Sequence, residues 1–326
     1  MEGNSYVLLL GDFMVNIYTM KNNICERGEN LVNDCWIDIV SPTYEELEEI
    51  ASKTLTDEAL LTKLLDKEEL PRIETSGTAT LIVIDTPYVV DAKDKGRHKY
   101  NTEPLGIIVN NGYFITISLK EQELLEDFKL GKVRDFSIAK KTRFIIQILL
   151  KTASFYQKEL MAINEDINSK EASLYKSTDN KKLLYLLNIE RTLVYFSTSL
   201  KANDVVLEKL AKGNILALYE ADVDLLDDAL IENKQAIEMA TIYREILTSM
   251  TDTYATIISN NLNDIMKFLA GITIVFSIPT MVASFMGMNV YLGDLGKSPF
   301  SFILIIIFSF VLSAVIALIL KRKNML

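Results

Sequence analysis

Two long apolar segments dominate the C-terminal part of the chain. Residues 266–286 contain one charged side chain, Lys267, and residues 299–320 contain none. A helix of about twenty residues, rising about 1.5 Å per residue, crosses a hydrocarbon core of about 30 Å. The pattern therefore predicts two transmembrane helices. Ser298 can cap the second helix and Pro299 suits its first position. A buried helical hairpin in a large soluble domain is the alternative interpretation.

A basic cluster orients this hairpin. Lys321, Arg322 and Lys323 follow the second apolar segment directly. Because Lys and Arg beside membrane helices stay on the cytoplasmic side, we expect the loop at residues 287–298 to lie outside. No apolar signal region occupies the first residues. The sequence thus predicts a multi-pass protein of the cell (plasma) membrane with cytoplasmic N- and C-termini.

The chain ahead of these segments divides into a mixed α/β part and a helical part. Apolar runs of strand length predict strands at residues 6–10, 36–40, 78–84 and 105–118, the last folded into a hairpin at residues 110–112. Thr43 and Glu46 form a capping box for a helix through Ala51. After Gly131, helical periodicity predicts two long helices, at about residues 135–175 and 180–211.

The segment from Asn214 to Ala270 contains neither proline nor glycine and continues into the first membrane segment. As one helix, its 57 residues would extend about 85 Å. Apolar side chains recur along it at alternate spacings of four and three, which is the seam of helices packed side by side. They are Ala236, Ala240, Tyr243, Leu247, Met250, Tyr254 and Ile257. Packing against the chain's own helices and self-association in a symmetric bundle both explain this seam.

Charge is divided unevenly along the chain. Residues 263–326 carry five basic and two acidic side chains, so residues 1–262 hold 29 basic against 42 acidic ones. This excess repels nucleic acid and attracts cations, although it also serves solubility alone. Cys25 and Cys35 lack the number and spacing of a disulfide framework or zinc site. Since the sequence shows no phosphate loop, nucleophile elbow or catalytic triad, we expect no enzyme, no organic cofactor and no nucleic-acid partner.

Polar side chains distinguish the two membrane segments. Asn263 and Asp264 directly precede the first segment. Hydroxyl groups recur along the first segment at Thr273, Ser277, Thr280 and Ser284, and along the second at Ser301, Ser309 and Ser313. Small hydroxyl residues also serve helix packing in membranes. The pattern favours a first helix that lines a pore and a second that faces lipid. Because one helix per subunit cannot enclose a pore, it also predicts an oligomer.

Three segments resemble the CorA family of magnesium channels and transporters. They are residues 276–289, which end in Gly287-Met288-Asn289, residues 231–240 and residues 36–43. The resemblance implies an α+β cytoplasmic N-terminal domain, a long stalk helix and two C-terminal transmembrane helices, assembled as a homopentameric funnel. It divides the chain into a cytoplasmic α/β domain (1–130), a cytoplasmic helical hairpin (131–213), a stalk continuing as the pore-lining helix (214–286), an extracellular loop (287–298), a second transmembrane helix (299–320) and a basic cytoplasmic tail (321–326).

The resemblance also implies roles for individual residues. It places the selectivity ring on Asn289, presented by a turn at Gly287 and Met288. Further pore-lining positions fall on Thr280, Ser277, Leu269, Asn263 and Asp252, with Leu269 in an apolar gate and Asp252 at the cytoplasmic mouth. A regulatory metal site between subunits falls on Asp228, with Asp91 or Asp94 of the neighbouring subunit as its partner.

These residues suit magnesium as both the transported and the regulatory ion. Mg²⁺ gives up its waters reluctantly, so neutral amide oxygens that bind the hydrated ion let it pass quickly. We therefore expect passive Mg²⁺ uptake that is driven by the membrane potential and closed by internal Mg²⁺. Met286 and Val290 depart from the aromatic residues that usually flank the family's tripeptide, and the outer loop offers only Asp294 as an acid.

Other functions remain open. Transport of Co²⁺, Ni²⁺ or Zn²⁺ is the nearer alternative, although the absence of His and Cys from the pore segment disfavours direct binding of such metals. A membrane-tethered scaffold or sensor that transports nothing is the alternative from another class. An anchor of that kind needs neither polar residues along one span nor Asn289.

Overall fold

The computed structural model describes residues 14–21, 24–89, 100–110, 112–174, 180–213, 215–216, 218–288 and 300–325. The chain forms two units. The first comprises Met1–Leu174 and Asp179–Ser249, and the second comprises Tyr175–Thr178 and Met250–Leu326. The two units are considered separately below.

A mixed sheet is the centre of the first unit. Its described strands are β1 (Met14–Lys21), β2 (Ile24–Gly28), β3 (Cys35–Val40), β4 (Arg72–Ser76), β5 (Ala79–Val89), β6 (Tyr100–Val109) and β7 (Tyr113–Ser118). They lie in the order β2-β1-β3-β7-β6-β5-β4. The neighbours β3 and β7 run parallel, and the other adjacent pairs run antiparallel. The strands expected at residues 36–40, 78–84 and 105–118 are thus present, and the one expected at 6–10 lies outside the described residues.

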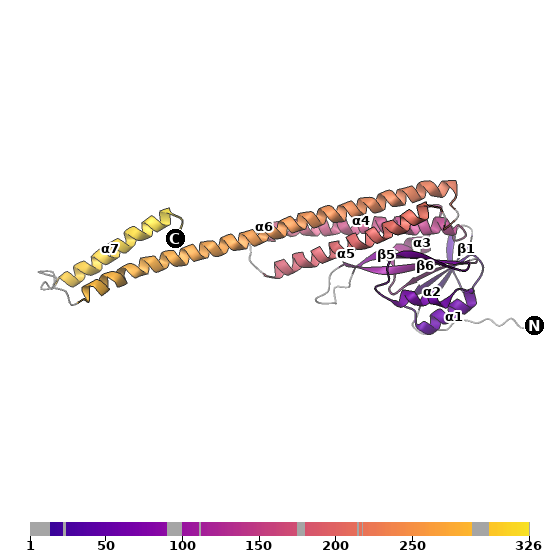
Figure 1. The fold of residues 1–326 in the computed structure, drawn as a ribbon, viewed down its shortest axis with the longest axis horizontal. Helices are drawn as coiled ribbons and strands as arrows, with labels where there is room; N and C mark the ends of the chain where they lie inside the picture. The colour runs from indigo at the N-terminus through magenta and orange to yellow at the C-terminus, as the bar shows by residue number, and fades with distance from the viewer. Residues whose placement is uncertain are drawn as a thin grey trace, which may run out of the picture. The chain divides into compact units, whose positions relative to one another are not determined.

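Both faces of the sheet are covered by helices. Successive side chains of a strand point to opposite faces. Trp36 and Phe114 accordingly join a core with α3 (Glu123–Lys129), α4 (Lys141–Leu174), α5 (Asn180–Ala211) and the start of α6 (Glu220–Met286). The next residues, Ile37 and Ile115, pack with α1 (Tyr44–Thr54), α2 (Glu58–Thr62) and the 3-10 turn η1 (Lys63–Leu65). Figure 1 shows α1 and α2 on one side of the sheet and α4 and α5 on the other.

Residues 36–43, which resemble the CorA family, hold a buried polar network and a helix cap. The indole Nε1 of Trp36 donates to Thr116 Oγ1 at 2.8 Å, and that hydroxyl donates to Asp38 Oδ1 at 2.7 Å. At Thr43, the expected capping box of α1 is confirmed, because Thr43 N donates to Glu46 Oε2 and Glu46 N donates to Thr43 Oγ1. These residues therefore build the fold of the first unit.

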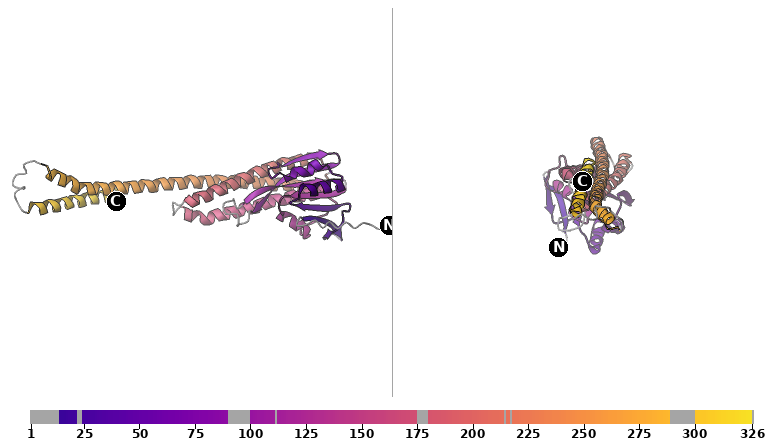
Figure 2. Two further views of the ribbon diagram at one scale, coloured as in Figure 1. Left: turned by 90° about the horizontal axis from the view of Figure 1, so that it is seen from below. Right: turned by 90° about the vertical axis from the view of Figure 1, so that its left-hand side faces the viewer.

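The long helices follow the expected pattern, with shifted starts. The helices α4 and α5 lie side by side (Figures 1 and 2) and occupy most of the ranges expected for them. Gly213, at a φ of +71°, follows the end of α5, and α6 begins at Glu220 instead of Asn214. The helix α6 therefore runs from Glu220 to Met286 and contains 67 residues.

Part of the heptad seam of α6 is buried within the single chain. Ala236 and Ala240 have no exposed surface and Leu247 is 1 % exposed. Met250 and Tyr254 are also buried. At Ala236, Ala240 and Leu247, packing within the first unit accounts for the seam.

The second unit contains the C-terminal part of α6 and the helix α7 (Ser301–Arg322), which lie side by side (Figures 1 and 2). The helix α7 is described from Ser301, and Leu304 N donates to the carbonyl of Phe300 at 3.1 Å. Ser298 and Pro299 themselves lie outside the described residues.

Candidate functional site

Two helices among the described residues are long and apolar enough to cross a membrane, by length and composition. They are α6, through its C-terminal part, and α7. Their apolar windows are mostly exposed, because 11 % of the window in α6 and 17 % of that in α7 is buried. The buried core helix of a soluble protein would show the opposite. The pair therefore fits the two predicted spans better than the alternative of a buried hairpin.

The serines of α7 are buried on the side of this helix that meets α6. Ser301, Ser309, Ser313 and Leu320 are the buried residues of α7, and their spacings place them on one stripe of the helix. On α6, the covered residues include Gly271 and Ile278. Small residues at a helix interface let two backbones approach closely in a membrane. The serines of the second span therefore serve packing, and most of its large apolar side chains are left exposed.

One of these serines compensates for a proline in the first span. Pro279 lies inside α6 and has no N–H, so the carbonyl of Val275 lacks its usual helical donor. Ser313 Oγ of α7 lies 3.5 Å from this carbonyl oxygen and donates to it. In a membrane, a backbone carbonyl without a partner is costly, and a serine from a neighbouring helix commonly satisfies it. The sequence analysis missed this contact, although Pro279 four residues after Val275 was a signal for it.

The opposite face of α6 carries the hydroxyl groups. Thr273, Ser277, Thr280 and Ser284 are all exposed. At about 100° per residue, the face centred on Ser277 and Thr280 lies about half a turn from the one that α7 covers. The hydroxyls of Ser277 and Thr280 donate to carbonyls of their own helix, at 2.8 Å and 3.2 Å. Since their protons are used in this way, their oxygen lone pairs point outward and can accept hydrogen bonds from hydrated cations.

All five predicted pore-lining residues fall on this uncovered side of α6. Asp252 and Thr280 are 28 residues apart and Asn263 and Ser277 are 14 apart, so each pair repeats at whole heptads. Leu269 is two heptads and three residues after Asp252, which places it beside the line through Asp252 and Thr280 on the helix surface. All five side chains are exposed in the single chain. The stripe runs from Asp252 to Thr280 over about 42 Å at 1.5 Å per residue. Asp252 lies about 21 Å along the helix before the start of the apolar segment at Met266.

The helix around the start of the membrane segment is uncovered all round. Every residue from 259 to 270 is exposed, including several large apolar side chains. These are Leu262, Ile265, Met266, Phe268 and Leu269, which is 63 % exposed. A contiguous apolar surface of this kind marks contact with a partner or with lipid. The single chain leaves this surface bare.

The tripeptide predicted to form the selectivity ring is described in part. Gly287 N donates to Ala283 O at 3.0 Å, and Met288 N donates to Phe285 O at 3.3 Å, so the last turn tightens as α6 ends. Both residues are exposed. Asn289 lies outside the described residues. The structure thus brings Gly287 to the C-terminal end of the polar stripe.

The residue predicted for regulation lies near the start of α6. Asp228 is exposed, as are its neighbours Asp224 and Asp227. Across the ranges that the structure describes, Asp228 makes no ion pair with another residue of the chain. Asp91 and Asp94, its predicted partners from another subunit, lie outside the described residues.

Among the described residues, no group of three or more His, Cys, Asp or Glu side chains could hold a metal ion within one chain. Cys25 and Cys35 are free and buried, as expected for packed thiols. Burial raises the pKa of Cys25 to about 11, so this thiol is protonated and a poor metal ligand at neutral pH. The candidate site is therefore the polar stripe of α6, which offers carboxylate, amide and hydroxyl oxygens.

Comparison with known proteins shows the family. The family described as "CorA-like Mg2+ transporter protein" matches residues 34–322. The chain belongs to the CorA family. It is 27 % identical over 298 residues to the cobalt/magnesium transport protein CorA of Methanocaldococcus jannaschii, which covers 89 % of this chain and 90 % of that protein. It is 20 % identical over 233 residues to the protein of the same name from Thermotoga maritima, covering 71 % and 65 % of the two chains.

Solved structures of the CorA type share the whole fold. The complete structure of the CorA magnesium transporter from Methanocaldococcus jannaschii superposes with a TM-score of 0.79 at 26 % identity, covering 95 % of this chain and 96 % of that one. The full-length CmaX protein gives a TM-score of 0.71 at 15 % identity, covering 96 % and 97 %. The expected CorA fold, with an α+β N-terminal domain, a long helix and a C-terminal apolar helix, is confirmed.

Proposed function

We propose that this CorA family member is a channel that mediates passive Mg²⁺ uptake. The observation that carries the proposal is the stripe from Asp252 to Thr280, which holds oxygen-bearing side chains on the side of α6 opposite α7. A transmembrane helix that served only as an anchor would gain nothing from polar groups on its uncovered side. Membership of a family described as Mg²⁺ transporters supports the same conclusion.

A pore of this kind requires several copies of the chain. One α6 cannot enclose a water-filled path, and the large apolar side chains at residues 262–269 have no cover in the single chain. Side-by-side association of α6 helices would bury these side chains while the polar stripe faced the axis. The resemblance to CorA favours a homopentamer with the pore on its symmetry axis.

Selectivity in this proposal depends on neutral oxygens. Five copies of Asn289, held by the turn at Gly287 and Met288, would contact the hydrated ion, and Thr280 and Ser277 would accept hydrogen bonds from its waters below. Leu269 would narrow the path, and Asp252 would form an acidic ring at the cytoplasmic mouth. None of these side chains strips water from Mg²⁺ as a tight carboxylate cage would.

The membrane potential supplies the driving force. At about 2.3 kcal/mol per elementary charge and 100 mV, a divalent cation gains about 4.6 kcal/mol on entry. The basic residues 321–323 at the end of α7 favour the orientation in which the N-terminal part, the C-terminus and Asp252 are cytoplasmic. The loop after Met288 then faces outward, where ions enter.

Mg²⁺ uptake into liposomes by the purified protein tests this function, with an internal dye as the reporter and an imposed negative inside potential. We expect uptake by the unaltered chain and its loss, by about tenfold or more, in Asn289→Ala. Asn188→Ala, an exposed asparagine of α5, is the matched control and should leave uptake unchanged. Uptake that is undiminished in Asn289→Ala would place the ion path elsewhere.

The same assay separates the alternatives. Both curated relatives are named as cobalt/magnesium transport proteins, so Co²⁺ is the first alternative ion to test, followed by Ni²⁺ and Zn²⁺. Passage of one of these ions without Mg²⁺ would replace the substrate and keep the channel. Absence of flux for every ion would favour the membrane-tethered scaffold.

Regulation is proposed to lie at Asp228. When internal Mg²⁺ is high, ions between Asp228 and Asp91 or Asp94 of a neighbouring subunit would hold the subunits in a closed arrangement. When it falls, the unscreened carboxylates repel one another and the subunits separate. Asp228→Ala should therefore maintain flux at internal Mg²⁺ levels that close the unaltered channel. Asp227→Ala, an equally exposed neighbour, should still close, and closure of both variants alike would remove Asp228 from the mechanism.

A further inference from the structure

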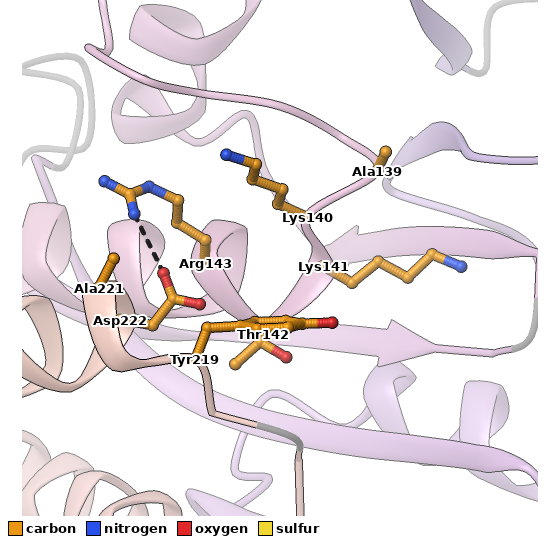
Figure 3. Close-up of a pocket in the computed structure, with 8 residues that line it drawn as sticks. All are labelled: Ala139, Lys140, Lys141, Thr142, Arg143, Tyr219, Ala221 and Asp222. Atoms are coloured by element: carbon orange, nitrogen blue, oxygen red, sulfur yellow. Dashed lines mark hydrogen bonds and ion pairs between the residues drawn. The ribbon is translucent and has the colours of Figure 1, made fainter.

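A cationic cleft lies in the first unit, where the start of α4 meets the start of α6 (Figure 3). Its volume is about 460 Å³, which lies within the range of small-molecule sites. The polar and aromatic side chains that line it include Lys140, Lys141, Arg143, Tyr219 and Asp222. Three of these are cationic and one is acidic, in a chain whose net charge is −10. The cleft is therefore locally positive, in contrast to the negative net charge of the whole chain.

The cations of the cleft have different partners. Arg143 Nη1 donates to Asp222 Oδ1 at 3.1 Å, which leaves the other nitrogens of the guanidinium for further acceptors. Its Nε is buried and has no hydrogen-bond partner among the described residues. Lys141 extends to the far side of the cleft, where it donates to the carbonyl of Asn110.

Lys140 differs from the other two cations of the cleft. It is exposed, and no carboxylate of the described residues lies within ion-pair distance of it. Figure 3 shows its ammonium group on the same side of the cleft as the Arg143 guanidinium. Lys140 and Arg143 thus point into the same space, and among the described lining residues Asp222 of α6 is the one carboxylate. Two cations in this arrangement attract an anion with more than one negative oxygen.

An aromatic ring completes the cleft. Tyr219 precedes α6 and is 71 % exposed, an unusual degree for a large ring. Figure 3 shows this ring beside Thr142, on the side of the cleft opposite Lys140. An exposed ring beside cations can stack on a planar organic group while the cations bind its phosphates.

We propose that this cleft binds a nucleoside polyphosphate from the cytoplasm. Lys140 and Arg143 contact the phosphates, and the ring of Tyr219 packs against the base. The start of α4 lines the cleft and has no acidic residue in its first turn, so the N-terminus of this helix adds a favourable field for an anion. Asp222 remains paired with Arg143 and excludes phosphates from that side. This binding is independent of ion transport, because it needs neither the pore stripe nor Asp228.

Calorimetric titration of the full-length protein in detergent with ATP, in EDTA to remove divalent cations, tests the proposal. Lys140→Ala should weaken ATP binding about tenfold, because it removes a charged hydrogen-bond donor. Tyr219→Ala should weaken ATP binding about fivefold and leave binding of tripolyphosphate unchanged. Lys201→Ala, an exposed lysine of α5, is the matched control and should bind ATP as the unaltered chain does.

Three outcomes would overturn the proposal. They are absence of ATP binding, ATP binding that Lys140→Ala leaves unchanged, and tripolyphosphate binding as tight as that of ATP. Neither Lys140 nor the ring of Tyr219 has a partner in the described fold, so both variants should fold normally. Circular dichroism and thermal unfolding of each variant check this directly. Since the readout is binding without divalent cations, its failure would leave the proposed channel function untouched.

Discussion

The hydrogen bond between α7 and the carbonyl opposite Pro279 offers a sharp test of how the two spans are held together. Ser313 Oγ donates to Val275 O at 3.5 Å, and this carbonyl has no helical donor because Pro279 lacks an N–H. Ser313→Ala removes the donor and leaves the Val275 carbonyl unsatisfied in the membrane. We therefore expect Ser313→Ala to destabilise the folded protein.

The size of the effect follows from the environment and the distance. Hydrogen bonds between membrane helices contribute about 0.6 kcal/mol on average and about 1.7 kcal/mol at most. At 3.5 Å the Ser313 bond is at the long end of the allowed range, so the lower figure applies. A loss of about 0.6 kcal/mol corresponds to a change of about threefold in the unfolding equilibrium.

A double-mutant cycle with Pro279→Ala isolates this bond. Alanine at position 279 restores the N–H that donates to Val275 O, so the carbonyl no longer depends on Ser313. In the Pro279→Ala background, Ser313→Ala should change the free energy of unfolding by close to nothing. The coupling energy between the two positions should therefore equal the whole effect of Ser313→Ala in the unaltered chain. This expectation follows from the missing N–H at position 279 of α6 and not from the size of the serine side chain.

Reversible unfolding in mixed detergent and SDS micelles, followed by circular dichroism, measures the four variants. Ser309→Ala is the matched control, because Ser309 lies on the same buried face of α7 and its Oγ has no partner among the described residues. It should cost less than Ser313→Ala. An equal cost of Ser313→Ala in the unaltered chain and in the Pro279→Ala background would refute the reasoning, as would an equal cost of the two serine variants.

Two further predictions concern the stability of the first unit. Its unfolding can be followed by the fluorescence of Trp36, the single tryptophan of the chain. Burial raises the pKa of Asp85 above its ordinary value of 3.8, and a hydrogen bond from Ser199 offsets this only in part, so ionisation of Asp85 opposes folding. This cost in the free energy of unfolding is absent below pH 3.8 and grows until the pH passes the raised pKa of Asp85. Over that pH window, Asp85→Asn should therefore become more stable relative to the unaltered chain. A difference in unfolding free energy that stays constant with pH would contradict this prediction. Lys129→Ala should cost about 3–5 kcal/mol, because it leaves Asp38, 1 % exposed and 2.9 Å from Lys129 Nζ, as an unpaired buried charge. The double change with Asp38→Asn should recover much of that loss, and no recovery would show that the ion pair is not the cause.

Local patterns in the sequence predicted most elements of this fold. A run of about twenty apolar residues, a capping box at Thr43 and alternating strand residues each act within a few turns of chain, so they are readable without the tertiary structure. The start of α6 was misplaced, because the structure begins this helix at Glu220 instead of Asn214. A helix starts at the residue whose carbonyl accepts the first helical hydrogen bond, and apolar periodicity alone does not specify that residue.

Strand order was not predictable in the same way. The parallel pair β3 and β7 joins residues about 80 positions apart, such as Trp36 and Phe114. Such a pairing depends on which faces the helices cover, and not on local preference. The buried network of Trp36, Thr116 and Asp38 depends on this pairing and was therefore invisible in the sequence.

By itself, the sequence determined that this protein has two membrane-spanning helices, an acidic N-terminal part and a polar first span, because composition and periodicity are local properties. The tertiary structure decided which sides of those helices meet. It placed the serines of α7 on α6, left Ser277 and Thr280 uncovered on the other side, and gathered Lys140, Arg143 and Tyr219 from separate elements into one cleft. Packing brings together residues that are distant in the chain, and no pattern within either helix specifies its partner's face.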